Sequence, residues 1–143
     1  MTYLLDVNVL VALLDPAHVF HDAAHVWFER EGQESWATCP LTENGAIRVF
    51  GHVRYPDGPG SPGAAAEFVG ALLEHSGHVF WSDEISLFTA SHVRPEALGT
   101  AAQVTDAYLL ALAVHRSAKL ATLDRRLSHA AVEGGAEALA FIG

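Results

Sequence analysis

Short apolar runs of strand length alternate along this chain with longer segments of helical periodicity. This alternation is typical of a parallel sheet covered by helices. Most of the runs are too apolar to leave one face in water, so helices are needed on both sides of the sheet. We therefore expect an α/β fold with one five-stranded parallel sheet. The expected strands are residues 3–5, 35–38, 78–81, 119–122 and 138–141.

The segments between these strands predict helices over residues 7–14, 18–31, 41–52, 64–75, 86–92 and 102–117, with a short helical turn near 125–129. One stretch, residues 55–63, stands apart because its prolines and glycines stop the third helix and delay the fourth. We interpret it as a surface loop. A mobile flap or a partner-docking segment is the functional alternative.

Length and composition indicate one domain over residues 1–143 with a sizeable core. The single cysteine, Cys39, excludes an internal disulfide, and no leader precedes the first expected strand. We therefore expect a cytoplasmic protein. No apolar run approaches the roughly 18 to 20 residues that a membrane span requires, so no membrane association is expected.

The charge balance is acidic, with 8 basic and 17 acidic residues and a formal net charge of −9. Such a balance argues against nonspecific, charge-driven wrapping of nucleic acid. It does not exclude nucleic acid as a substrate, because divalent ions held by converging acids would invert the local electrostatics.

Four acids lie where apolar elements begin or end. Asp6 and Asp124 each follow an expected strand, and ligands of open parallel sheets bind outside the carboxyl ends of the strands. Asp106 is expected in the first turn of a central apolar helix. Glu43 is expected in the first turn after Pro40, a residue that suits a helix start. All four acids can therefore meet at one edge of the sheet.

Clustered carboxylates raise one another's pKa values, and a bound Mg²⁺ or Mn²⁺ ion removes that penalty while gaining the oxygen ligands it prefers. The alternative for any single acid is helix capping or compensation of the helix dipole, worth about 0.3 to 1 kcal/mol. Two acids at strand ends and two at helix starts favour a metal site.

Asn8 and Thr105 are weaker candidates for the site, whereas for Asp83 a capping role is favoured. Asn8 can hydrogen-bond a ligand carboxylate or a bound water, as outer groups of metal sites commonly do. Thr105 directly precedes Asp106 and either supports the site or caps the helix. Asp83 also follows an expected strand, but Ser82 or Asp83 is well placed to cap the next expected helix.

The histidines and the cysteine indicate no separate chemistry. His18, His21 and His25 have a spacing that suits zinc, but a helix with apolar neighbours needs a polar outer face, and we expect solvated side chains there. Cys39 has no base nearby in sequence, so we expect a small buried residue rather than a nucleophile.

The motifs around the four acids resemble a known family. The chain is similar to PIN domains, and specifically to VapC-type toxins of bacterial toxin-antitoxin pairs, over nearly its whole length. The loop near Gly60 is a weaker point of likeness. The matching segments are Leu5-Asp6-Val7-Asn8-Val9-Leu10, Leu41-Thr42-Glu43-Asn44, Val104-Thr105-Asp106-Ala107-Tyr108-Leu109 and Leu120-Ala121-Thr122-Leu123-Asp124.

The resemblance implies that Asp6, Glu43, Asp106 and Asp124 form a catalytic, metal-binding quartet, with Asn8 as a polar helper. Thr105 matches the family's second helper. The implied activity is metal-dependent endoribonucleolytic cleavage by an activated water, with unpaired loops of transfer or ribosomal RNA as substrates. Candidate phosphate contacts are Arg48, Arg54, Arg116, Arg125 and Arg126.

The resemblance also implies a homodimer and a VapB-type antitoxin that silences the toxin, often with a basic side chain in the acidic site. Attraction between such a segment and a chain at −9 would favour fast association.

Three other functions remain open. A haloacid-dehalogenase-type phosphatase also begins with a strand that ends in aspartate, but Asn8 stands where its second aspartate is required. A PIN-like module that binds RNA or a partner without cutting would not need the complete quartet. A housekeeping RNA-processing nuclease would share the same site and would differ in its genetic neighbourhood.

Overall fold

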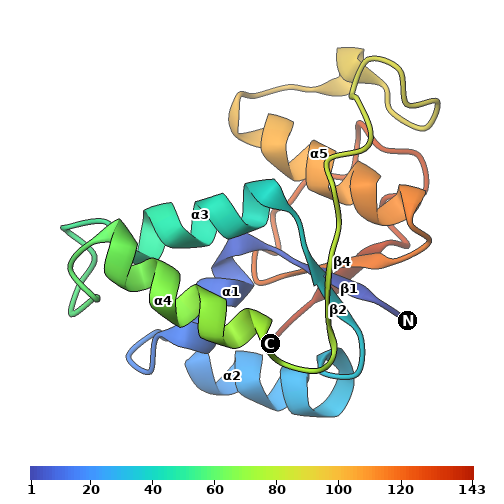
Figure 1. The fold of residues 1–143 in the computed structure, drawn as a ribbon. Coiled ribbons are helices and arrows are strands. Elements are labelled where there is room, and N and C mark those ends of the chain that lie inside the picture. Colours follow the sequence, from blue (N-terminus) through green and yellow to red (C-terminus); the bar gives the residue numbers. More distant parts are fainter.

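The computed structural model describes residues 1–143 and contains one five-stranded, entirely parallel sheet (Figure 1). The strand order is β3-β2-β1-β4-β5, so the first strand lies at the centre. The predicted fold class is confirmed, and each strand lies within a residue or two of its expected bounds. The strands are β1 (Tyr3–Leu5), β2 (Trp36–Thr38), β3 (His78–Phe80), β4 (Lys119–Thr122) and β5 (Leu139–Phe141).

Helices cover both faces of the sheet, with α5 on one side and α1 to α4 on the other (Figure 1). The segment expected as one helix over 18–31 instead begins at His21 and ends in a π-helical turn. The helices are α1 (Val7–Leu14), α2 (His21–Trp27), the π-helix η1 (Phe28–Gly32), α3 (Pro40–Phe50), α4 (Pro62–Leu73), the 3₁₀ turn η2 (Pro95–Ala97) and α5 (Ala102–His115). No helix has the length and hydropathy needed to cross a bilayer.

Alternate residues of the central strands pack into two separate hydrophobic cores. Leu4 of β1 pairs with Leu120 of β4, and both are buried under α5. Leu5 pairs with Ala121, and both are buried under the α1 side. Because both side-chain directions of these strands are apolar, the sheet cannot expose either face, which explains the two helical layers.

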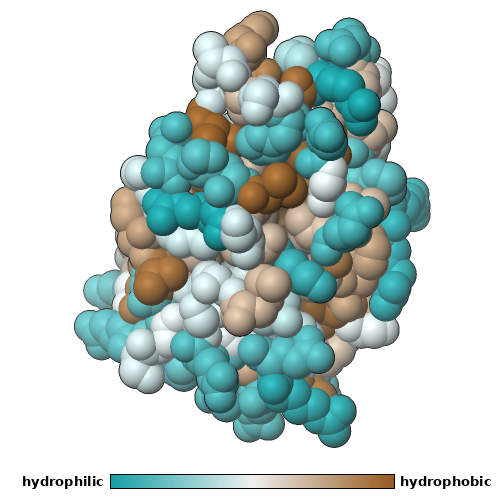
Figure 2. All heavy atoms as spheres, turned by 90° about the vertical axis from the view of Figure 1, so that its right-hand side faces the viewer, coloured by the Kyte–Doolittle hydropathy of each residue, from teal (hydrophilic) through white to brown (hydrophobic).

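The edge strand β3 departs from this pattern. Val79 is 43% exposed and Phe80 is 55% exposed, so this strand is not among those buried on both faces. The face of the molecule on the right-hand side of Figure 1 is mostly hydrophilic, and apolar side chains form separate spots on it (Figure 2).

The helix predicted over 86–92 is wrong. The hydroxyl of Ser86 accepts a hydrogen bond from the N–H of Phe88, which closes a local turn. The chain that follows pairs with the C-terminal region, where Val93 bridges Val132. The helical turn predicted near 125–129 is also wrong: the N–H of Leu127 bonds to Asp124 O, and no helix follows.

Helix α3 begins as expected at Pro40 and carries Glu43 in its first turn. The fully buried Cys39 precedes it, and its N–H donates to the Thr42 hydroxyl at 3.0 Å, so the cysteine has the structural role expected. Gly45 allows α3 to approach α1, since a Cβ there would lie 2.5 Å from Cγ2 of Val7. The Glu43 turn is thereby packed beside the residue that follows Asp6.

Candidate active site

Asp6 is fixed at the junction of β1 and α1. Its Oδ1 accepts the N–H of Val7 at 2.8 Å and so caps the helix, while its Oδ2 accepts the Thr122 hydroxyl at 2.8 Å. The residue is only 7% exposed. Burial raises the pKa of Asp6, whereas the two hydrogen bonds oppose that rise. The carboxylate is therefore rigid, desolvated and without a basic partner.

Thr122, the last residue of β4, connects three parts of the site and is fully buried. Besides donating to Asp6, its hydroxyl oxygen accepts the amide of Asn8 at 3.3 Å and the N–H of Asp124 at 3.1 Å. Asn8 in turn accepts the N–H of Leu123 at 3.2 Å. The expected helper Asn8 thus holds the turn after β4 in place. Thr122 was not predicted as a site residue, although its position two residues before Asp124 could have indicated it.

Three of the four predicted acids face one pocket. A cavity of about 340 Å³ is lined by Asp6, Asp106 and Asp124, which come from the junction of β1 and α1, from α5 and from the turn after β4. Asp106 lies just beyond the first turn of α5 rather than inside it. Burial, followed by the charges of Asp6 and Asp124, raises the pKa of Asp106 to about 6. These carboxylates repel one another across the pocket.

Glu43 lies at the neighbouring strand end and does not line that pocket. Its Oε2 accepts the hydroxyl of the buried Thr38 at 2.6 Å, and the same hydroxyl oxygen lies 2.7 Å from Nε2 of His78. Burial lowers the pKa of His78, and the charge of Glu43 opposes that change. Glu43 therefore lies outside the lining of that pocket and is hydrogen-bonded to Thr38, next to His78.

Thr105 is exposed on α5 and makes no side-chain hydrogen bond to any of the acids. It does not cap the helix either, since Ala101 occupies that position. Asp83 also caps nothing: it accepts the hydroxyl of Tyr108 at 2.9 Å. The capping interpretations for both residues are wrong.

His18 and Tyr55 line the acidic pocket and were not predicted to do so. Nδ1 of His18 accepts the N–H of Phe20 at 3.0 Å. The hydroxyl of Tyr55 donates to Asp15 at 2.5 Å, so the start of the proline- and glycine-rich loop is tied to the end of α1. The loop therefore contributes one wall of the pocket, a role that its composition alone does not reveal.

The other two histidines of the zinc-like spacing have structural contacts. His21 hydrogen-bonds Ala12 O at 2.7 Å, and His25 hydrogen-bonds Leu13 O at 2.9 Å. They satisfy carbonyls at the end of α1 instead of being merely solvated.

The donor set of the acidic pocket suits a hard divalent cation. No three Asp, Glu, His or Cys side chains converge tightly enough to enclose an ion by themselves. Mg²⁺ does not require such a cage, because it usually retains several waters and uses one or two carboxylates together with substrate phosphates. Burial and, after it, the charges of Asp6 and Asp124 raise the pKa of Asp106, and a bound cation relieves both penalties.

The sequence comparisons agree with this geometry. The family model described as "PIN domain" matches residues 3–133. The chain belongs to the PIN domain family, among its VapC-type members. Ribonuclease VapC44 of Mycobacterium tuberculosis is 40% identical over 134 residues, 94% of each chain. Ribonuclease VapC39 of the same organism is 38% identical over 139 residues, 97% of this chain and 100% of its own. Ribonuclease VapC38 is 42% identical over 122 residues, 85% of this chain and 84% of its own.

Proposed function

We propose that this chain is the toxin of a type II toxin-antitoxin pair and acts as a Mg²⁺- or Mn²⁺-dependent endoribonuclease on structured RNA, with loops of transfer or ribosomal RNA as targets. The observation that carries this proposal is the pocket in which Asp6, Asp106 and Asp124 face one another, in a PIN domain whose relatives are named ribonucleases. A non-catalytic binding module would have no use for repelling carboxylates in a pocket.

A bound divalent ion would activate a water for attack on the phosphodiester and neutralise charge developing on the phosphate. Asp6, Asp106 and Asp124 would hold it, and Glu43 would join them from its neighbouring position. Thr122 and Asn8 hold Asp6 and the turn that carries Asp124 in fixed positions. Val11 and Val49 line the same pocket and limit the water around the acids. No side chain is required as a covalent nucleophile.

We further infer a cytoplasmic homodimer that a VapB-type antitoxin silences. The net charge of −9 and the acidic pocket support a basic antitoxin segment as the inhibitor. A housekeeping RNA-processing nuclease would use the same pocket. A gene for a small antitoxin next to that of this chain would separate the two roles in favour of the toxin.

The nuclease activity is tested with purified protein and total bacterial RNA. We expect cleavage only with Mg²⁺ or Mn²⁺ and its loss in Asp6→Asn, with an unchanged circular dichroism spectrum. Asn keeps an acceptor for the N–H of Val7, so the helix cap survives. Cleavage that persists both in chelator and in Asp6→Asn would exclude the metal-dependent mechanism.

The toxin role needs a separate experiment in cells. Induced expression should arrest growth, and Asp106→Asn expressed at the same level should not. Sequencing RNA ends after induction would identify the cleaved RNA. Equal growth of wild type and variant in a susceptible host would contradict the toxin role while leaving the nuclease activity open to the test above.

A further inference from the structure

Two surface hollows adjoin the acidic pocket at the end of α3. They measure about 470 and 480 Å³, and Arg48 and His52 line both of them. Val49 and Tyr55 line the second hollow and also the acidic pocket. The three cavities therefore form one continuous surface, which runs from the carboxylates to Pro62 at the start of α4.

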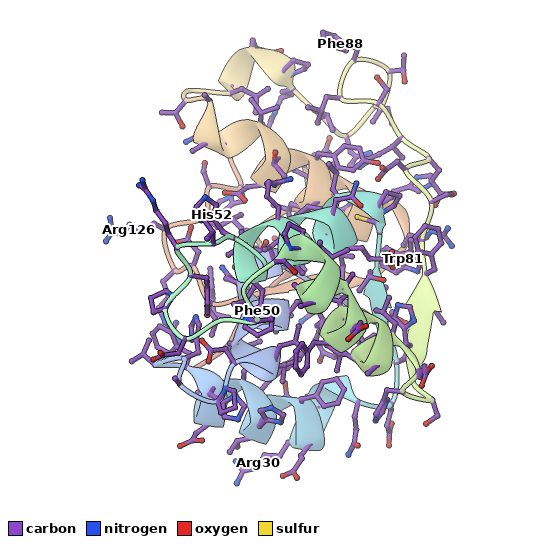
Figure 3. The ribbon with its side chains drawn as sticks, turned by 60° about the vertical axis from the view of Figure 1, so that its left-hand side comes forward. Arg30, Phe50, His52, Trp81, Phe88 and Arg126 are labelled. Carbon is purple, nitrogen blue, oxygen red and sulfur yellow. The ribbon has the colours of Figure 1, made fainter.

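This surface is basic in an acidic protein. No Asp or Glu lines either hollow, whereas Arg48, His52 and Arg54 do. Neither arginine forms an ion pair, since both ion pairs of the structure involve Glu84. With Arg125 and Arg126, which directly follow Asp124, four of the 8 basic residues of the chain flank the acids. Figure 3 shows His52 and Arg126 on the same side of the molecule, far from Arg30.

In two histidines of this surface, a backbone hydrogen bond to one ring nitrogen determines which nitrogen can donate. Nδ1 of His52 accepts the N–H of Arg54 at 3.0 Å, just as Nδ1 of His18 accepts the N–H of Phe20. An imidazole whose Nδ1 accepts a hydrogen bond carries its proton on Nε2 when neutral. Both rings thus keep an Nε2–H donor that the protein itself does not use, one in the acidic pocket and one in the hollows.

We propose that His18, Arg48, His52 and Arg54 form a phosphate-binding track for the RNA strand that leads to the acidic pocket. The inference rests on the proposed nuclease function. Fixed N–H donors and unpaired guanidinium groups are the chemistry that recognises successive phosphates. The amino end of α4 opens onto the same hollow and adds its partial positive charge. Continuity with the acids favours the substrate over a protein as the occupant.

The five arginines predicted as phosphate contacts differ in their position relative to this surface. Arg48 and Arg54 lie on the track, and Arg125 and Arg126 flank the acids. Arg116 is different, because it pairs with Glu84 and lies 5.3 Å from the ring of Trp81. We exclude Arg116 from the track.

The test compares two double variants with equal charge change: Arg48→Ala with Arg54→Ala, and, as the control, Arg30→Ala with Arg94→Ala. Arg30 and Arg94 are exposed and line none of these three cavities. Binding of fluorescein-labelled total transfer RNA is measured by anisotropy at several salt concentrations, in an Asp6→Asn background that prevents cleavage. In the cleavage-competent background, kcat and KM are measured on the same RNA.

We expect the track variant to bind RNA about 10- to 100-fold more weakly. The slope of log K against the logarithm of the salt concentration should fall by the amount that corresponds to about one to two phosphate contacts. Its KM should rise while kcat changes by less than about threefold, because the acids are intact. The control should stay within about twofold of wild type. Equal binding by the two double variants would overturn the track and leave a protein partner as the occupant. A wild type that binds RNA without cutting it would instead contradict the proposed function and leave the track standing.

Discussion

The carboxyl edge of the sheet contains two acidic regions that differ in how their charges are satisfied. In the pocket between β1, β4 and α5, Asp6, Asp106 and Asp124 face one another, and no Lys or Arg lines the pocket. At the end of β2, Glu43 accepts a 2.6 Å hydrogen bond from the Thr38 hydroxyl. The imidazole of His78 lies 2.7 Å from the same hydroxyl oxygen. The carboxylates of the first region repel one another, whereas the carboxylate of the second is already hydrogen-bonded.

The largest contrast should appear in catalysis. Asp106→Asn removes a charge from the pocket itself, and we expect RNA cleavage to fall by at least about 10³-fold, since metal-assisted charge stabilisation contributes several kcal/mol. Glu43→Gln, which keeps an acceptor for Thr38, should cost only about 10- to 100-fold. Cleavage rates at saturating Mn²⁺ would compare the two. Equal losses would mean that Glu43 contributes to metal binding and catalysis as directly as Asp106 does.

The second prediction concerns the hydrogen-bonded chain behind Glu43. Thr38→Val keeps the shape of the fully buried side chain but removes the hydroxyl, so the glutamate loses its orientation. We expect the affinity for Mn²⁺, measured by calorimetry, to fall about 10-fold, as is typical when an outer hydrogen-bond partner is lost. Thr38→Ser restores the hydroxyl and should recover most of the affinity. If Val and Ser variants behave alike, the hydroxyl does not position Glu43.

The sequence predicted the pocket better than it predicted Glu43. Asp6 and Asp124 follow strands that are hydrogen-bonded neighbours, so parallel topology alone places them together. Glu43 was correctly expected in the first turn of its helix. The direction of its side chain, however, depends on Thr38 and His78, which are 5 and 35 residues away. Such long-range hydrogen bonds leave no periodic signal in the sequence.

The errors in secondary structure have the same origin. The segment over 86–92 has the composition of a short helix, yet the backbone of Val93 and its neighbours pairs with the segment around Val132. Tertiary pairing outweighs weak local propensity in an element of this length. The strands were predicted well because alternate residues of the central ones, such as Leu4 and Leu5, feed two different cores.

The third prediction concerns the stability effect of the raised pKa of Asp106, which burial and the neighbouring carboxylates cause together. Because the pKa of Asp106 is raised to about 6, above an ordinary value of about 3.9, the folded state loses stability as the pH rises from about 4 through 6. In chelator at pH 7.5, Asp106→Asn should therefore raise Tm by about 3 °C, or roughly 1 kcal/mol after allowance for solvent screening. The difference should vanish near pH 4. A thermal scan at both pH values measures it.

Divalent metal provides the control for that effect. Adding Mg²⁺ should raise the Tm of the wild type and raise that of Asp106→Asn less, because binding to the native state stabilises it in proportion to affinity. A variant that is less stable than wild type at pH 7.5 without metal would contradict the view that the pocket carboxylates are held against their mutual repulsion.

The smallest effect is expected for Asp83, which follows an apolar strand as Asp6 does but has different surroundings. Both follow an apolar strand, yet Asp83 is exposed and accepts the hydroxyl of Tyr108 at 2.9 Å. Burial and the charge of Asp83 raise the pKa of Tyr108, so the phenol remains a donor throughout the physiological range. Asp83→Asn keeps an acceptor for that phenol, and RNA cleavage should stay within about twofold of wild type because an exposed contact contributes little. A loss comparable to that of Asp106→Asn would show that the functional surface extends past α5 to the end of β3.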